Sequence, residues 1–230
     1  MTILCQEHYQ LSKKKQAMKL TLKQIKETIG SLSAPSKMPC SGYSIPAKEC
    51  KVGSLLREVK GSTCSGCYAL AGRYKFKNVE DAMYKRLGAI QSDIEQWTEY
   101  MAYAINNFNK GDKNYFRWHD SGDIQDEVHL NAINEIAKRT PKVRHWLPTR
   151  EVNIVKKWLE SNTPAENLVI RQSAHMNDRQ PSTRLTGHAS GVIDKNTELK
   201  GNVCPAPTQG NQCGDCRACW EVETVLYHKH

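Results

Sequence analysis

Residues 114–173 have the sequence NYFRWHDSGDIQDEVHLNAINEIAKRTPKVRHWLPTREVNIVKKWLESNTPAENLVIRQS, and this stretch decides the fold. It contains three short apolar segments, at residues 115–118, 143–147 and 168–170, which are typical of buried strands. The two segments between them have helical periodicity, with apolar faces made of Leu130, Ile133, Ile136 and Ala137 in the first and of Val152, Val155 and Leu159 in the second. This alternation predicts an α/β fold with a short parallel sheet or a partial (β/α) barrel.

Helical and cysteine-rich segments flank this core. Residues 1–32 form a lysine-rich segment with one apolar helical face, in which Gly30 suits the C-terminal cap. Residues 33–77 are rich in Ser, Pro, Gly and Cys, and they predict a loop-rich module. Residues 78–194 hold the α/β core, with a helical stretch interrupted near residues 91–93 and a short fourth strand at Val192-Ile193. Residues 195–230 again predict loops, and we expect residues 1–230 to form a single domain.

The composition is that of a globular protein in a reducing compartment. Of the 230 residues, 39% are hydrophobic and 25% are charged, which excludes collagen-like and fully disordered chains. No apolar run approaches the roughly 18 residues that a membrane span needs. We therefore expect a cytoplasmic protein without a membrane partner.

The net charge of +9 is unevenly distributed along the chain. Residues 1–90 contain 16 Lys and Arg against 6 Asp and Glu, whereas residues 91–230 contain 17 against 18. A positive field confined to the first part predicts weak, salt-sensitive and sequence-independent association with nucleic acid. A solvated helix face is the alternative interpretation.

The cysteines carry most of the functional information, because grouped cysteines in a reducing compartment are more often metal ligands than disulfides. The C-terminal group is Cys204-x8-Cys213-x2-Cys216-x2-Cys219, with a proline directly after its first member. Two successive C-x2-C steps resemble the ferredoxin arrangement for a [4Fe–4S] cluster more than the paired knuckles of a zinc site. The spacing therefore favours an iron–sulfur cluster, with zinc as the alternative.

A second group of cysteines lies in the loop-rich module, as Cys40-x9-Cys50-x13-Cys64-x2-Cys67. We interpret it as a second four-cysteine site, so that one or two clusters are expected. A thioredoxin-like redox pair at Cys64 and Cys67 is the competing interpretation. If both groups of cysteines instead bind one metal centre, some of the thiols would have no metal to bind. The ninth cysteine, Cys5, stands alone near the start of the chain.

Polar residues follow each predicted strand, at the edge where parallel α/β sheets place their sites. The candidates for catalysis are His119, Asp120, Asp123, Arg150 and His175, and the candidates for cofactor binding are Arg117 and Ser173. His119 is suited to proton exchange near neutral pH, and Arg150 is suited to holding an anionic group. The alternatives are helix capping by Asp123 or Thr149 and a structural arginine–carboxylate network that includes Arg117, Arg144 and Arg171.

The motifs around these residues resemble a known family. They are Met38-Pro39-Cys40-x-Gly-Tyr43-Ser44-x-Pro46-Ala47, Gly61-Ser62-x-Cys64-x2-Cys67-Tyr68-Ala69-x2-Gly72-x-Tyr74, Phe116-Arg117-Trp118-His119-Asp120-Ser121-Gly122-Asp123, Trp146-Leu147-Pro148-Thr149-Arg150 and Cys204-Pro205-Ala206-x6-Cys213-x2-Cys216-x2-Cys219-Trp220. Over about residues 35–220 the sequence is similar to the bacteriophage "gene product eighty-eight" family. The resemblance implies a phage protein acting in an infected host cell, and it implies no particular reaction.

A looser similarity connects Cys64-x2-Cys67-Tyr68-Ala69 with radical S-adenosylmethionine proteins, which combine a partial barrel with a loop ending in Cys-Tyr-Ala. S-adenosylmethionine is the cofactor that this similarity implies, but the usual C-x3-C-x2-C is absent, since the preceding cysteine is Cys50. A cluster on Cys50, Cys64 and Cys67 with one open iron remains an option.

Two functional hypotheses result. The first is a phage-encoded iron–sulfur protein, either a redox or radical-type enzyme with a small-molecule substrate or an electron carrier with a redox partner. The second is a zinc-stapled nucleic-acid-binding protein, which the basic first 90 residues favour.

Overall fold

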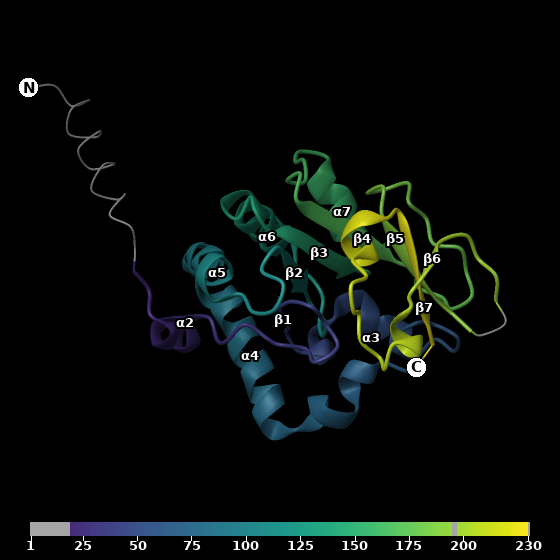
Figure 1. The fold of residues 1–230 in the computed structure, drawn as a ribbon, viewed down its shortest axis with the longest axis horizontal. Coiled ribbons are helices and arrows are strands. Elements are labelled where there is room, and N and C mark those ends of the chain that lie inside the picture. The colour runs from purple at the N-terminus through teal and green to yellow at the C-terminus, as the bar shows by residue number, and fades with distance from the viewer. Residues whose placement is uncertain (1–18, 195–196, 230) are drawn as a thin grey trace, which may run out of the picture.

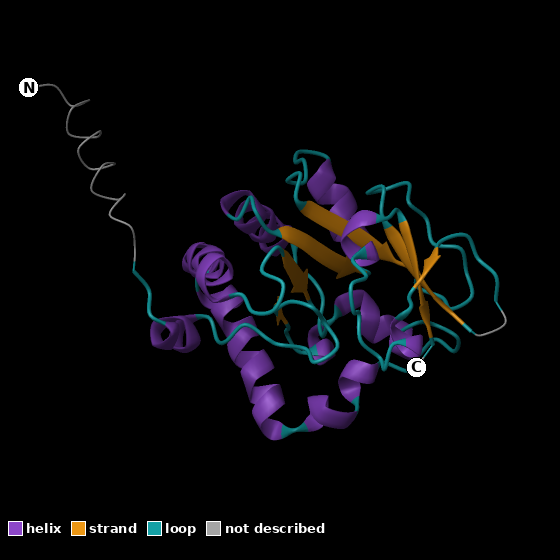
Figure 2. Ribbon diagram, viewed as in Figure 1, coloured by secondary structure: helices purple, strands orange, loops and turns teal. Residues whose placement is uncertain are grey.

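The computed structural model describes residues 19–194 and 197–229, and in them seven strands form one sheet with every pairing parallel (Figures 1 and 2). The strands are β1 (Gly42–Tyr43), β2 (Tyr115–Trp118), β3 (Arg144–Thr149), β4 (Leu168–Ser173), β5 (Ala189–Ile193), β6 (Asn202–Val203) and β7 (Thr224–His228). Their order in the sheet is β1-β2-β3-β4-β5-β7-β6. The predicted α/β class with a parallel sheet is therefore confirmed.

The α-helices of the described residues are α2 (Leu22–Thr28), α3 (Lys51–Arg57), α4 (Lys77–Ser92), α5 (Ile94–Phe108), α6 (Glu127–Arg139), α7 (Val152–Leu159) and α8 (Ala218–Glu221). Four short 3₁₀ turns accompany them: η1 (Ala47–Glu49), η2 (Tyr68–Leu70), η3 (Gly72–Lys75) and η4 (Ala206–Thr208). In this described part of the chain, no helix is long and apolar enough to cross a membrane.

Local signals in the sequence explain several helix boundaries. The break predicted near residues 91–93 lies between α4 and α5, where the Asp93 side chain accepts the Gln96 N–H at 2.9 Å. Asp126 caps α6 in the same way, since its side chain accepts the His129 N–H at 2.7 Å. Gly30 follows α2 with φ of +75°, a backbone conformation that favours glycine, so the predicted C-terminal cap is confirmed.

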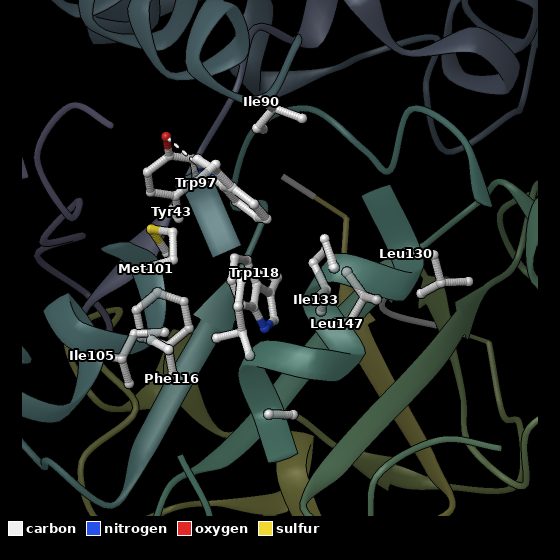
Figure 3. Close-up of a cluster of buried hydrophobic side chains, with 14 of the residues drawn as sticks. Tyr43, Ile90, Trp97, Met101, Ile105, Phe116, Trp118, Leu130, Ile133 and Leu147 are labelled. Atoms are coloured by element: carbon white, nitrogen blue, oxygen red, sulfur yellow. Dashed lines mark hydrogen bonds between the residues drawn. The ribbon is translucent and has the colours of Figure 1, made fainter. Parts of the chain in front are cut away.

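One face of the sheet packs against α5, α6 and α7 and forms the main hydrophobic core (Figure 3). Side chains alternate between the two faces of a strand, and Phe116 and Trp118 of β2 therefore point towards the helices together with Leu147 of β3. Trp97 and Met101 of α5 pack against them. This core fixes the position of the strand ends, where the candidate site lies.

The opposite face of the sheet is covered by the C-terminal part of the chain. Trp146 of β3 packs there against Trp220 of α8, with ring centroids 5.3 Å apart, and against Tyr227 of β7. In Figure 1 the C-terminal segment is coloured yellow, and its strand β7 lies next to β5 in the sheet while α8 lies against β3. The sheet therefore has a helical face and a face covered by a cysteine-rich segment.

The prediction of loops throughout residues 195–230 is wrong, because β7 pairs with β5 over five residues and α8 precedes it. Val225 and Leu226 are buried in that strand. An apolar run so short looks like a loop until a neighbouring strand supplies its hydrogen bonds. The loop-rich module likewise contains the short strand β1 and the helix α3.

Candidate functional site

Three of the cysteines gather at the carboxyl-terminal edge of the sheet, and we call Cys50, Cys64 and Cys67 the edge cysteines. Cys64 and Cys67 both lie close enough to Cys50 to act electrostatically on its thiol. A β-carbon placed on Gly53 would lie 3.6 Å from Cys50 Sγ and 3.7 Å from Cys64 Sγ, so both sulfurs border the same small space. Glycine at position 53 keeps that space open.

The loop that carries the edge cysteines is anchored to the ends of β3 and β4. Glu151 Oε1, directly after β3, accepts the N–H groups of Lys51 at 3.1 Å and Val52 at 2.8 Å, at the start of the helix that follows Cys50. Thr63, next to Cys64, donates its N–H to the His175 carbonyl at 2.9 Å. These contacts join segments about a hundred residues apart in sequence, and they hold Cys50 and Cys64 over the strand ends.

Arg150 and His175, two of the predicted catalytic residues, lie beside the edge cysteines. The Arg150 Nε donates to Thr63 Oγ1 at 2.9 Å, and its charge lowers the pKa of both Cys50 and Cys64 against the larger effect of burial. The Nε2 atom of His175 lies 3.3 Å from the Arg150 carbonyl. The Arg150 guanidinium thus places a positive charge beside Cys50 and Cys64.

Asp123 is buried at the same edge of the sheet, and its carboxylate joins the segments that follow β2 and β3. Its carboxylate accepts hydrogen bonds from Thr149 Oγ1 at 2.6 Å and from the N–H groups of Arg150 and Ile124, both at 2.8 Å. Burial raises the pKa of Asp123 to about 6, although these hydrogen bonds act to lower it. Thr149 does not cap α7 but joins Asp123 to the Glu151 N–H, so the turn after β2 is tied to the turn after β3.

Asp120 holds the segment that follows Cys67. Its Oδ2 atom accepts the Tyr74 hydroxyl at 2.7 Å, its Oδ1 accepts the Ser44 hydroxyl, and its carbonyl accepts the Tyr68 hydroxyl. These contacts tie η2 and η3 to the end of β2. Asp120 is therefore a positioning residue for the cysteine loop.

His119 is placed differently from the other predicted catalytic residues. It is buried with φ of +50°, which is rare outside glycine, and its ring packs against His129 of α6 with centroids 5.3 Å apart. Neither ring nitrogen has a hydrogen-bond partner among the described residues. Burial and the neighbouring His129 hold the pKa of His119 well below its usual value, which favours a neutral ring.

The remaining cysteines of the described chain gather on the face of the sheet, and we call them the face cysteines: Cys40, Cys204, Cys213, Cys216 and Cys219. Cys213 lies near Cys40, Cys204 and Cys216, and Cys219 lies near Cys204. The Cys213 N–H donates to the Lys37 carbonyl at 3.1 Å, which brings the segment before Cys40 onto the C-terminal loop. Cys40, expected to join Cys50, Cys64 and Cys67, therefore lies with the C-terminal group instead.

Arg171 connects the segment that carries Cys219 to the sheet through hydrogen bonds. Its guanidinium donates hydrogen bonds to the backbone carbonyls of Ala189, Ala218, Cys219, Val222 and Glu223. Its side chain is fully buried, and a buried guanidinium requires this degree of pairing. The partners of Arg171 are carbonyls rather than the carboxylates of the expected network, whereas exposed Arg144 does pair with Glu221 at 3.1 Å.

Arg117 connects the face cysteines with the edge of the sheet. Its guanidinium carbon lies 4.6 Å from the centroid of the Trp146 ring, and its Nη1 atom is 3.4 Å from Met38 Sδ. Its charge acts on the thiols of Cys40, Cys213 and Cys219. Ser173, the other predicted cofactor-binding residue, is buried and lies with its Oγ 3.3 Å from Ser190 Oγ.

The chemistry of the donors fits a thiolate-bound metal at both places. The eight described cysteines form no disulfide. Burial raises the pKa of Cys40 to about 12 and of Cys219 to about 11, and it also raises the pKa of Cys50 and Cys64. A metal ion would compensate this cost, because it binds the thiolate and displaces the proton. No three His, Cys, Asp or Glu side chains of the described residues are already arranged around one point, so the sulfurs would have to turn inward on binding.

Sequence reasoning missed Glu151, Thr63 and the tyrosines on Asp120, all of which position the cysteine loop. Tyr68 and Tyr74 belong to the motif that contains Cys64 and Cys67, whereas Glu151 and Thr63 stand at no motif position. The partners of all four residues lie far away in the sequence. Cys5 and the three consecutive lysines of the lysine-rich N-terminal segment, Lys13, Lys14 and Lys15, lie outside the described residues.

Comparison with known proteins supports the resemblance seen in the motifs. The family model described as gene product 88 matches residues 3–222. Searches of curated proteins and of solved structures find no match. Because the family model covers nearly the whole sequence, the chain belongs to the gene product 88 family.

Proposed function

We propose that this protein is an iron–sulfur protein with a redox or radical-type enzyme site at the edge cysteines. The observation that supports this most is the gathering of Cys50, Cys64 and Cys67 where the parallel strands end, beside Arg150 and Asp123. Parallel α/β sheets place ligand sites at this edge. Three protein thiolates also leave one iron of a [4Fe–4S] cluster without a cysteine ligand.

A [4Fe–4S] cluster, when bound, supplies one-electron chemistry. The chain contributes the surroundings: Arg150 offers a cation for an anionic group of the substrate, and Glu151 and Thr63 hold the loop in place. A small molecule at the open iron, with S-adenosylmethionine as one candidate, would contact this edge. Asp123 serves as a structural tie, since its carboxylate is already occupied by three donors.

The face cysteines fit a second, fully coordinated cluster. Cys204, Cys213, Cys216 and Cys219 would supply four thiolates, and Cys219 packs beside the aromatic rings of Trp146, Trp220 and Tyr227 on the sheet face. A cluster with four protein ligands passes electrons without binding substrate. We therefore propose that the face cysteines serve electron transfer or structure.

Iron and sulfide analysis of anaerobically prepared protein tests the proposal. The protein should be brown and contain iron and acid-labile sulfide for two clusters. Cys64→Ser and Cys216→Ser should each remove about half of the iron, as expected for two separate sites. Stoichiometric zinc with no iron or sulfide would refute the proposal and support the zinc-stapled alternative.

A further inference from the structure

Residues 68–77, with the sequence YALAGRYKFK, follow directly after Cys67 and combine aromatic and basic side chains. They include Arg73, Lys75 and Lys77 and contain no acidic residue. We call them the basic–aromatic segment. It spans η2, η3 and the start of α4, and Figure 1 shows this part of the chain projecting below the sheet between α3 and α4.

The basic–aromatic segment is held in a defined position rather than only tethered at its ends. The hydroxyls of Tyr68 and Tyr74 both donate to Asp120, and the two rings contact each other with centroids 5.9 Å apart. The backbone adds turn hydrogen bonds from Leu70 N to Cys67 O and from Phe76 N to Arg73 O, both at 3.1 Å. A ligand bound here would thus meet a preformed surface.

Two aromatic side chains of this segment are exposed. Phe76 is 59% exposed and Tyr68 is 45% exposed. Phe76 also occupies the N-cap of α4, where it forms no side-chain capping hydrogen bond and where Ser, Thr, Asp or Asn would stabilise the helix. Helix capping therefore does not account for this phenylalanine, and its exposed ring is available for contact with a flat ligand.

The segment itself carries a net positive charge, and the carboxylate of Asp120 lies beneath it as part of its anchor. The nearest acidic residues in the sequence are neutralised, since Glu80 pairs with Lys48 at 2.5 Å and Asp81 pairs with Lys77 at 3.0 Å. Arg73 and Lys75 are exposed beside the two rings in the sequence. The surface therefore offers stacking platforms together with cations.

We propose that the basic–aromatic segment binds a single-stranded polynucleotide, with bases stacked on Phe76 and Tyr68 and phosphates bound by Arg73 and Lys75. Exposed rings interleaved with basic residues are how proteins bind single strands without sequence preference. Because the segment follows directly after Cys67, a bound strand would lie next to the edge cysteines, and we infer that a polynucleotide is the substrate class. This last step rests on the proposed function, whereas the binding itself does not.

Fluorescence anisotropy with labelled 12-nucleotide single-stranded DNA and RNA, using the full chain, tests the proposal. Phe76→Ser should weaken binding about tenfold, because it removes the ring on which one base stacks. Leu22→Ser, which removes a similarly exposed apolar side chain from α2, is the matched control and should bind like wild type. The DNA and RNA arms show which polynucleotide is preferred.

The salt dependence tests the charges separately. The pair Arg73→Gln and Lys75→Gln should reduce the slope of log K against log salt by about 0.7 for each phosphate that the protein no longer neutralises. Lys142→Gln with Lys156→Gln makes the same charge change at exposed positions in the turn before β3 and on α7, and it should leave the slope unchanged.

Equal binding by wild type and Phe76→Ser, equal binding of duplex and single strand, or no binding at all would each overturn the proposal. Iron content measured on the same samples separates the two hypotheses. Protein that holds iron but binds no strand refutes this inference alone. Protein that binds the strand but no iron refutes the iron–sulfur function and leaves the binding surface in place.

Discussion

The edge cysteines and the face cysteines use the same side chain in two different settings. Cys50, Cys64 and Cys67 lie at the ends of parallel strands, next to Arg150. Of the five face cysteines, Cys40 and Cys219 lie among the rings of Trp146, Trp220 and Tyr227. The charges of Arg117, Arg171 and Arg217 act on thiols of this group. Three thiols leave a cluster incomplete, and five exceed what one cluster needs. The difference is the basis of our proposal that the first group serves chemistry and the second serves structure or electron transfer.

The two groups also differ in how they are anchored. The edge loop is held by contacts with Glu151, Thr63 and Asp120. The helix α8 and the chain beside it are held by the buried Arg171 guanidinium, by the Trp220 indole N–H on the Phe116 carbonyl and by the Arg144–Glu221 ion pair. Because different contacts hold the edge cysteines and the face cysteines, we expect that a substitution can disrupt one group and leave the other intact.

Arg171→Met should have the largest effect. It removes every hydrogen bond between the guanidinium and the carbonyls around α8 and leaves those carbonyls unpaired, at a cost of about 4 kcal/mol in the free energy of unfolding. Urea unfolding measures this loss, and iron analysis should show that the face site is emptied while the edge site retains its cluster. Equal loss of iron from both sites would contradict separate anchoring.

Acid should act on both groups together, because it destabilises the core beneath them. His145 is buried on β3, accepts the Trp118 indole N–H at its Nδ1 and lies with Nε2 2.7 Å from Thr140 Oγ1. Burial lowers the pKa of His145 to about 3. A proton on Nδ1 would face the Trp118 N–H, so the folded protein keeps this ring neutral.

The unfolded chain binds a proton at His145 near pH 6.5, and the folded protein does not until about pH 3. The stability from neutral His145 is therefore fully present above pH 6.5 and is lost as the pH falls towards 3. Between pH 6.5 and 4 the free energy of unfolding should fall by about 3 kcal/mol from this residue alone. Urea unfolding of His145→Gln should show a shallower pH slope than wild type, and identical slopes would refute this assignment.

Glu151→Ala should damage only the edge group. It removes the acceptor for the Lys51 and Val52 N–H groups at the start of α3, with a loss of about 1–2 kcal/mol, comparable to that of a helix cap. Iron at the edge site should decrease and the face site should keep its cluster. Glu151→Gln retains an acceptor oxygen and serves as the matched control, and a loss of face-site iron in Glu151→Ala would argue against the comparison.

Local patterns in the sequence were sufficient to predict the strands and helices that form the helical face of the sheet. The strand Tyr115–Trp118, the break at Asp93 and the helix through Leu130 and Ile133 depend on periodicity and caps, which a short window of sequence contains. The position of Arg150 and His175 next to each other also followed from parallel topology, because strand ends meet at one edge.

Contacts between segments that are distant in the sequence could not be predicted from local patterns. Cys40 lies with Cys213, 173 positions further along the chain, through a backbone contact of its neighbour Lys37. The strand β7 is recognisable only from its pairing with β5. The orientation of His119 depends on a left-handed backbone conformation, which a histidine in the sequence does not predict. Each of these is decided by packing between segments rather than by the segment itself.

Cys40→Ala should have the smallest effect, and it tests whether the face group has a spare thiol. Four cysteines remain, and their spacing suffices for one cluster, so the iron and sulfide content should equal that of wild type. Cys40 is buried, and loss of its sulfur should cost about 1 kcal/mol in the free energy of unfolding. Cys213→Ala is the matched variant, since its sulfur belongs to the C-x2-C-x2-C run, and it should lose the cluster of the face site. If Cys40→Ala loses that iron and Cys213→Ala keeps it, Cys40 is a ligand, and the face site draws on both ends of the chain.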